Sequence, residues 1–410
     1  MVVSGVVSLA TVPFVVVYAG KDAWASVAVG QSLGSIIGIF TLLGWVQNGP
    51  TEVARTTPEI RGAYFARSAY VRSLSLVVTV PAICAASVLL GTTYVWLCAL
   101  AALAMLVTNL GASWFFVGEG NPRGLFLFET LPRALGIVVA TAALAWGASP
   151  VVYGVLTLAG SVCAVAASWA DVFRRNRVTG FEAPTLREVG AIVWGQKHGI
   201  GTAVLSAVYQ SVPLLIVQGL YAGATASFAL ADKIKQQAMT AYRPVSQVAQ
   251  GWTPRGSASE VRRRVEKVAK LIVPVATVAA VVSASAGPFA ANLLSGGNIQ
   301  VGWGMSAAFG IAFGMNIVSL TVGVACLVPI GREAAITASA ALGLLTFCVS
   351  AVPLGILAGG GGIAWSVACG QTVVAVYQLV VLAAHLRTEH RGDRAGDAPA
   401  ERRAFVGAPE

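Results

Sequence analysis

The chain has 410 residues, of which 56% are hydrophobic and only 11% are charged. Soluble globular domains carry about 25% charged residues, so this composition excludes an ordinary soluble protein. The net charge of +10 is not concentrated in one patch. It recurs in separate loops, which argues against a nucleic-acid-binding protein.

The apolar residues lie in long blocks. About 20 helical residues are needed to cross about 30 Å of hydrocarbon, and these blocks have that length. Strands of a membrane barrel would show about 10 residues of alternating polarity, which the blocks do not. We therefore predict an all-α integral membrane protein of about twelve transmembrane helices. In chain order the predicted spans are 2–18, 23–46, 74–91, 94–117, 131–147, 151–170, 199–220, 223–250, 268–290, 301–329, 334–357 and 363–386.

The loops between these spans alternate between basic and uncharged. The first basic loop contains Arg55, Arg61, Arg67 and Arg72, and later ones contain Arg174, Arg187, Arg264 and Arg332. The intervening turns at 91–93, 148–150, 221–223, 295–300 and 359–362 contain no Lys or Arg. Basic residues are retained on the cytoplasmic side, so the pattern predicts that both termini are cytoplasmic.

The chain also contains an internal repeat. The residues from Tyr18 through 23–31 recur from Tyr221 through 224–232, and a proline precedes each copy, Pro13 and Pro213. A repeat of six spans keeps its orientation, so we expect two six-helix bundles related by a pseudo-two-fold axis along the membrane normal. The predicted division is residues 1–180, residues 181–387 and a disordered cytoplasmic tail at 388–410.

Ionisable residues concentrate in the predicted span 223–250. At 100° per residue, Asp232, Gln236, Arg243, Gln247 and Gln250 fall within about 60° of one another. Ionisable groups inside a membrane usually face a cavity. We interpret this stripe as one wall of a hydrated, net cationic cavity that receives an anionic headgroup. The candidate substrate-binding residues are Asp232, Lys233, Lys235, Gln236 and Arg243, with Gln31 from the repeat-related span. In the alternative interpretation, Asp232 pairs with Lys235 or Gln236 on its own helix and has only a structural role.

A second charged cluster follows the fourth predicted span. It contains the acid–arginine pairs Glu119 with Arg123 and Glu129 with Arg133. These pairs are candidates for a cytoplasmic gate that opens and closes with substrate. Static helix-end ion pairs, which contribute little at a surface, are the alternative.

No residue pattern indicates a cofactor. All six cysteines lie in apolar spans and the three histidines are scattered, so neither a disulfide nor a metal site is predicted. The glycine run 359–362 lacks the Lys and Ser/Thr of a phosphate-binding loop. We expect no enzymatic activity.

Two segments carry a family resemblance. The run from Trp114 to Arg123, together with 129–133, is similar to the fourth-to-fifth-helix region of O-antigen-type polysaccharide flippases. The segment 228–234 resembles the start of their eighth helix. These flippases belong to the multidrug/oligosaccharidyl-lipid/polysaccharide exporter superfamily. The similarity extends over nearly the whole chain in topology, through loose motifs.

The resemblance implies a V-shaped, alternating-access transporter (MATE-like) in a bacterial cytoplasmic membrane. Its implied substrate is a polyprenyl-diphosphate-linked oligosaccharide, a polysaccharide precursor flipped from the cytoplasmic to the outer leaflet. Lys233, Lys235 and Arg243 would meet the diphosphate or acidic sugars. The implied partners are membrane lipids, a coupling cation (H⁺ or Na⁺), and the polymerase and glycosyltransferases of the same pathway. The segment 209–213 lacks the polar charge that many relatives carry in the seventh helix, which leaves a coupling site there unsupported.

Three rivals remain at this point. The first is an ion-coupled multidrug antiporter of the same fold, which would favour carboxylates in its cavity. The second is a membrane-embedded glycosyltransferase or ligase, and the third is a scaffold that transports nothing.

Overall fold

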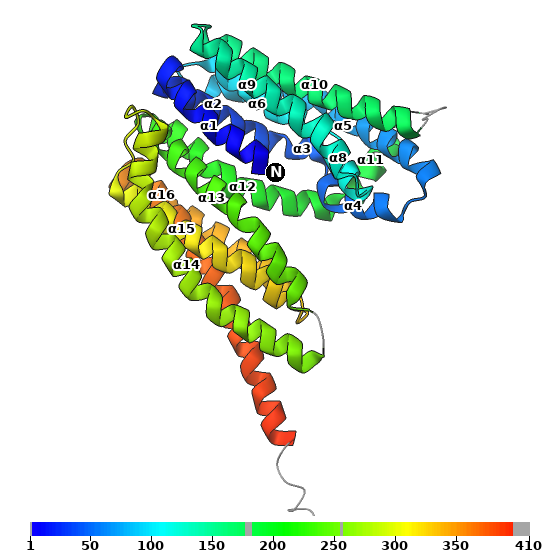
Figure 1. Cartoon of the computed structure of the whole chain (residues 1–410), viewed down its shortest axis with the longest axis vertical. Helices are drawn as coiled ribbons and strands as arrows, with labels where there is room; N and C mark the ends of the chain where they lie inside the picture. The colour runs from blue at the N-terminus through cyan, green and yellow to red at the C-terminus, as the bar shows by residue number, and fades with distance from the viewer. Residues whose placement is uncertain (1, 177–182, 255–256, 397–410) are drawn as a thin grey trace, which may run out of the picture.

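The computed structural model describes residues 2–176, 183–254 and 257–396, and Figure 1 shows their arrangement. These residues form helices and no strands. The N-terminal bundle consists of α1 (Val2–Ala19), α2 (Lys21–Ile37), α3 (Ile39–Leu42), α4 (Trp45–Arg55), α5 (Pro58–Leu89), α6 (Val95–Thr108), α7 (Ser113–Gly118), α8 (Pro122–Gly124), the π-helix η1 (Leu125–Thr130), α9 (Leu131–Ala145) and α10 (Pro150–Asn176). The helix α11 (Leu186–Gly195) then leads into the C-terminal bundle. This bundle consists of α12 (Lys197–Leu220), the 3-10 turn η2 (Ala222–Ala224), α13 (Thr225–Trp252), α14 (Ala258–Leu294), α15 (Trp303–Thr321), the π-helix η3 (Val322–Leu327) and α16 (Ala334–Gly396).

The helices account for the twelve predicted spans. Within the described residues, eight helices are long and apolar enough to cross a membrane, and α1 and α12 add two shorter apolar stretches. The helix α16 crosses twice, because Ala358 and Gly359 leave the helical conformation there and Gly359 has a positive φ of 56°. Its two halves pack back to back, since Gly343 and Gly370 contact each other. The remaining span is α13. Its polar face makes it too polar to be counted among the helices that qualify as membrane spans by composition.

Two helices begin well before their predicted spans. The helix α5 starts at Pro58, and α14 starts at Ala258 behind a capping box formed by Ser257 and Glu260. The hydropathy pattern marks only the part of each helix that lies in the hydrocarbon. The helix itself continues beyond the hydrocarbon, where its residues are basic. Arg61, Arg67 and Arg72 therefore lie on a helix and not in the predicted loop.

The hydrophobic cores show how the bundles meet. One cluster joins both bundles and includes Val16 and Val29 with Val217 and Phe228. In each of the other three clusters the buried residues come from a single bundle, two in the N-terminal bundle, around Phe115 and Leu106, and one in the C-terminal bundle. The bundles thus share a core at one end and separate at the other, which gives the V shape in Figure 1.

The shared end carries the turns that the charge pattern predicts to be outside. The amide Nε2 of Gln218 donates to the carbonyl oxygen of Leu90 at 3.2 Å, and Gly296 lies beside Val17. The helix α12 of the C-terminal bundle packs on α2, α3 and α4 of the other bundle. The V therefore opens toward the predicted cytoplasmic side.

The helix α16 extends into the segment that was predicted to be a disordered tail. The helix continues to Gly396, beyond residue 388 where disorder was expected to begin. Residues 397–410 lie outside the described residues, as do residues 177–182, which contain the predicted boundary between the bundles. The disorder of the tail past 396 and the exact boundary between the bundles remain predictions.

Candidate functional site

The C-terminal bundle contains a polar cavity of about 490 Å³. This is within the range of roughly 300–1,000 Å³ that is usual for ligand pockets. The helices α12, α13, α15 and α16 form its walls. Its lining includes the predicted residues Lys235, Gln236 and Arg243, together with Tyr209, Gln210, Asn316, Ser319, Thr337 and Gln371. We call it the C-cavity.

The cation Lys235 is held in place at the wall of the C-cavity. Its Nζ lies 2.6 Å from Oδ1 of Asp232 and 5.1 Å from the ring centroid of Phe309. The other carboxylate oxygen of Asp232 accepts a hydrogen bond from Nε2 of Gln236 at 2.6 Å. The local pairing considered in the alternative interpretation is therefore present. It coexists with the cavity, because Lys235 and Gln236 both line it.

The second cation of the C-cavity is more accessible. Arg243 is exposed, and no ion pair to it is found among the described residues. No carboxylate lines this cavity in the described part of the chain, since Asp232 lies behind Lys235. The surface offered to a ligand is thus cationic and rich in hydrogen-bonding groups.

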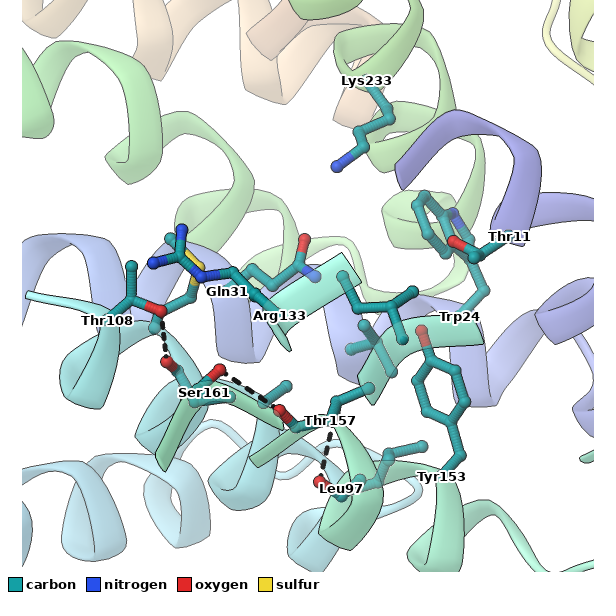
Figure 2. Close-up of a pocket in the computed structure, with 16 residues that line it drawn as sticks. Thr11, Trp24, Gln31, Leu97, Thr108, Arg133, Tyr153, Thr157, Ser161 and Lys233 are labelled. Atoms are coloured by element: carbon teal, nitrogen blue, oxygen red, sulfur yellow. Dashed lines mark hydrogen bonds between the residues drawn. The ribbon is translucent and has the colours of Figure 1, made fainter. Parts of the chain in front are cut away.

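A second, smaller cavity of about 90 Å³ lies in the N-terminal bundle among α1, α2, α6, α9 and α10. We call it the N-cavity, and Figure 2 shows its lining. The predicted residues Gln31 and Arg133 line it. So does Lys233, which reaches it from α13 of the other bundle. The six candidate substrate residues were expected to share one cavity. Instead Gln31 and Lys233 line the N-cavity, Lys235, Gln236 and Arg243 line the C-cavity, and Asp232 lines neither.

The four candidate gate residues all lie within the N-terminal bundle. Glu119 pairs with Arg175 of α10 at 3.1 Å rather than with the exposed Arg123. Arg175 also holds Asp171 at 2.7 Å. Glu129 and Arg133 pair as expected, at 3.0 Å. Neither acid–arginine contact joins the two bundles in this conformation.

The buried, structural position of Arg72 was not predicted from the sequence. The sequence pattern assigned it to a basic loop, yet its side chain is fully buried. Its Nη1 donates to the carbonyl oxygens of Asn109 and Gly111, and its guanidinium stacks over the ring of Trp114 at 5.5 Å. These contacts hold the break between α6 and α7. Glu129 accepts a hydrogen bond from the amide of Ala112 at the same break.

The neutral lining of the C-cavity was also missed. Gln210, Asn316 and Gln371 come from three helices that are apolar overall, so no helical stripe identified them. The sequence signal that could have identified them is a single polar residue within an apolar span, because such residues usually face a cavity or another helix.

Comparison with known proteins shows the fold. No protein-family model matches the sequence, and no curated protein matches it. Among solved structures, an inward-facing multidrug resistance MATE family transporter of the MOP superfamily is similar, with a TM-score of 0.69 and 13% identity over 95% of this chain and 96% of the other. The lipid II flippase MurJ in an inward closed conformation is similar with a TM-score of 0.63 and 12% identity, over 93% of this chain and 86% of the other.

The chain thus has the MATE-like membrane transporter fold, with two six-helix bundles. A multidrug resistance MATE family transporter in an outward-facing conformation has a TM-score of 0.54, against 0.69 for the inward-facing one, at the same coverage of 95% of this chain. This difference agrees with the shared core at one end of the V. The similar structures thus include multidrug resistance MATE family transporters and the lipid II flippase MurJ.

Proposed function

We propose that the protein flips a polyprenyl-diphosphate-linked oligosaccharide from the cytoplasmic to the outer leaflet of a bacterial plasma membrane by alternating access. The observation that carries the proposal is the C-cavity, a polar space with two cations and no lining carboxylate among the described residues. A diphosphate matches its charge, and sugar hydroxyls match its amides and hydroxyls.

The orientation of the chain is part of the proposal. The exposed tryptophans Trp96, Trp146 and Trp303 stand next to the uncharged turns at the shared end of the V. Tryptophan is enriched at membrane interfaces. With the basic loops at the other end, both termini are cytoplasmic and the open side of the V faces the cytoplasm, where the lipid-linked sugar is made.

The principal rival is a multidrug antiporter that exports cations. A cationic drug favours an available carboxylate, but Asp232 is engaged by Lys235 and Gln236 at 2.6 Å each. The arrangement of the C-cavity therefore favours an anionic cargo. The proposal includes no covalent step, and it leaves the coupling cation (H⁺ or Na⁺) unassigned. The polymerase and glycosyltransferases remain proposed pathway partners.

The test neutralises the C-cavity in cells. The double variant Lys235→Gln/Arg243→Gln should lower glycan export at least about tenfold, since it removes both charges offered to the diphosphate. The matched control Lys267→Gln/Arg263→Gln removes the same charges from exposed positions on α14 and should export normally at equal membrane abundance. Full export by the C-cavity variant, or resistance to cationic drugs conferred by the native protein without any glycan phenotype, would overturn the proposal.

A further inference from the structure

The second span is bent where α3 meets α4. The helix α3 ends before Leu43 and α4 begins after Gly44, and these two residues have positive φ values of 47° and 82°. Glycine adopts this left-handed conformation freely, whereas leucine is strained in it because its Cβ approaches the following carbonyl oxygen. Leu43 is the one residue other than glycine with a positive φ in the part of the chain that the structure describes. Such strain persists only where the surrounding structure fixes it.

The surroundings of Leu43 fix the bend from both bundles. Its side chain is buried in the hydrophobic cluster around Phe115. The same cluster is contacted by Ile200 of α12, one turn after the junction between α11 and α12 at Gln196. A Cβ at Gly44 would lie 3.2 Å from the carbonyl oxygen of Gln196 and 3.3 Å from the amide nitrogen of Ile200. The bend in the second span and the α11–α12 junction are therefore in direct contact.

A side-chain hydrogen bond joins these two breaks. The amide Nδ2 of Asn48, in the first turn of α4, donates to Oε1 of Gln196 at 2.7 Å. Both side chains are half-buried, so water competes for the bond only in part. Figure 1 shows α12 extending from the C-terminal bundle to α4, and the two helices are in contact. The bond thus links the N-terminal bundle to the start of α12 at the separated end of the V.

We propose that the Asn48–Gln196 hydrogen bond is a latch that holds α4 in the strained bend and keeps the V open. When the latch opens, nothing in that bond opposes the strain at Leu43. Leu43 and Gly44 then return to the right-handed helical conformation, and α3 continues straight into α4. This movement carries Asn48 away from Gln196 and releases the start of α12, which follows its own bundle as the V closes. The latch goes beyond the proposed function and does not depend on the cargo.

A latch and a purely structural bond respond differently to substitution. A bond that is present in both conformations stabilises both equally, so its loss leaves their ratio unchanged. A latch exists in one conformation only, so its loss changes the ratio. Relief of the strain at Leu43 must oppose the loss of the latch, because both act on the same bend.

The test measures the opening of the V by double electron–electron resonance in nanodiscs. Spin labels at Arg174→Cys and Arg332→Cys occupy exposed positions at the separated end, one in each bundle, in a chain whose six native cysteines are replaced by alanine. Without further substitution, this labelled chain should show mainly the long distance of the open V. Asn48→Leu removes the donor at similar volume and should raise the ratio of closed to open molecules about fivefold, as expected for one hydrogen bond.

The partner residue provides an internal check. Gln196→Leu should raise the ratio of closed to open molecules as much as Asn48→Leu does. The double variant Asn48→Leu/Gln196→Leu should change the ratio no further, because the two substitutions remove the same bond and are not additive.

Substitutions at position 43 separate strain from the loss of a side chain. Leu43→Gly removes the Cβ that is strained in the left-handed conformation, whereas the matched control Leu43→Ala removes most of the side chain and keeps the Cβ. In the Asn48→Leu background, Leu43→Gly should return the ratio of closed to open molecules toward the native value, and Leu43→Ala should not. Gly44→Ala adds strain at a φ of 82° and should raise the ratio with the latch intact.

Two results would overturn the latch. One is an unchanged distance distribution in both Asn48→Leu and Gln196→Leu. The other is an equal response to Leu43→Gly and Leu43→Ala in the Asn48→Leu background. If Asn48→Leu does not fold, Gln196→Leu tests the same bond from the other bundle and takes its place as the background. Glycan export is not the measured quantity, so the outcome is separate from that of the test of the C-cavity.

Discussion

Lys233 and Lys235 lie two residues apart on α13, yet their side chains line cavities in opposite bundles. Two residues correspond to about 200° on a helix, so neighbouring cations face nearly opposite directions. The helix α13 packs on α15 of its own bundle and on α1 and α2 of the other. It is therefore the element through which charge in one cavity can affect the other.

Asp232→Asn should destabilise the protein by about 1–3 kcal/mol. The substitution removes the negative charge that neutralises Lys235 at 2.6 Å, and a cation without a counter-charge in a partly buried position is unfavourable. An anion in the C-cavity would replace the lost carboxylate. Thermal melting should thus show a larger stabilisation by pyrophosphate in Asp232→Asn than in the native chain. An equal or smaller stabilisation would contradict the role assigned to Lys235.

Glu129→Gln should destabilise the N-terminal bundle by about 2–4 kcal/mol. It removes the charge that compensates Arg133 at 3.0 Å and leaves two arginines without a carboxylate between them. Chemical or thermal unfolding in detergent measures the change. Glu119→Gln is the control, because Arg175 keeps Asp171 as a partner and is itself exposed. That change should cost less than about 1 kcal/mol.

Gly136→Ala should loosen the contact between α9 and α10. A methyl group at Gly136 would lie 2.6 Å from the Cα of Gly160, so the two helices would have to separate. Small residues permit such close approach in membranes, and overpacking typically costs about 1–3 kcal/mol. Gly219→Ala has open space around its Cβ and should be neutral or slightly stabilising in the same melting assay.

The orientation can be checked with single cysteines in a chain whose six native cysteines are replaced by alanine. Ser149→Cys, in the exposed turn before α10, should react with a membrane-impermeant maleimide in intact cells. Arg332→Cys, in the exposed turn between η3 and α16, should react only after permeabilisation. The reverse pattern would invert the proposed topology.

The number of spans and the polar face of α13 could be predicted from the sequence, because bilayer thickness and helical periodicity act locally. The predicted start of α5 and the predicted loop position of Arg72 were wrong. That arginine is stabilised by the carbonyl oxygens of Asn109 and Gly111, which are distant in sequence. Glu119 was also predicted to pair with the nearby Arg123, whereas its partner is Arg175 of α10.

By itself the sequence determined a twelve-span helical membrane protein with a duplicated architecture, since hydrocarbon requires long apolar helices and cytoplasmic retention of basic residues orders the loops. Only the tertiary structure decided that the polar residues serve two cavities. Which cavity a side chain enters depends on the packing of both bundles around α13, and helical periodicity contains no information about that packing.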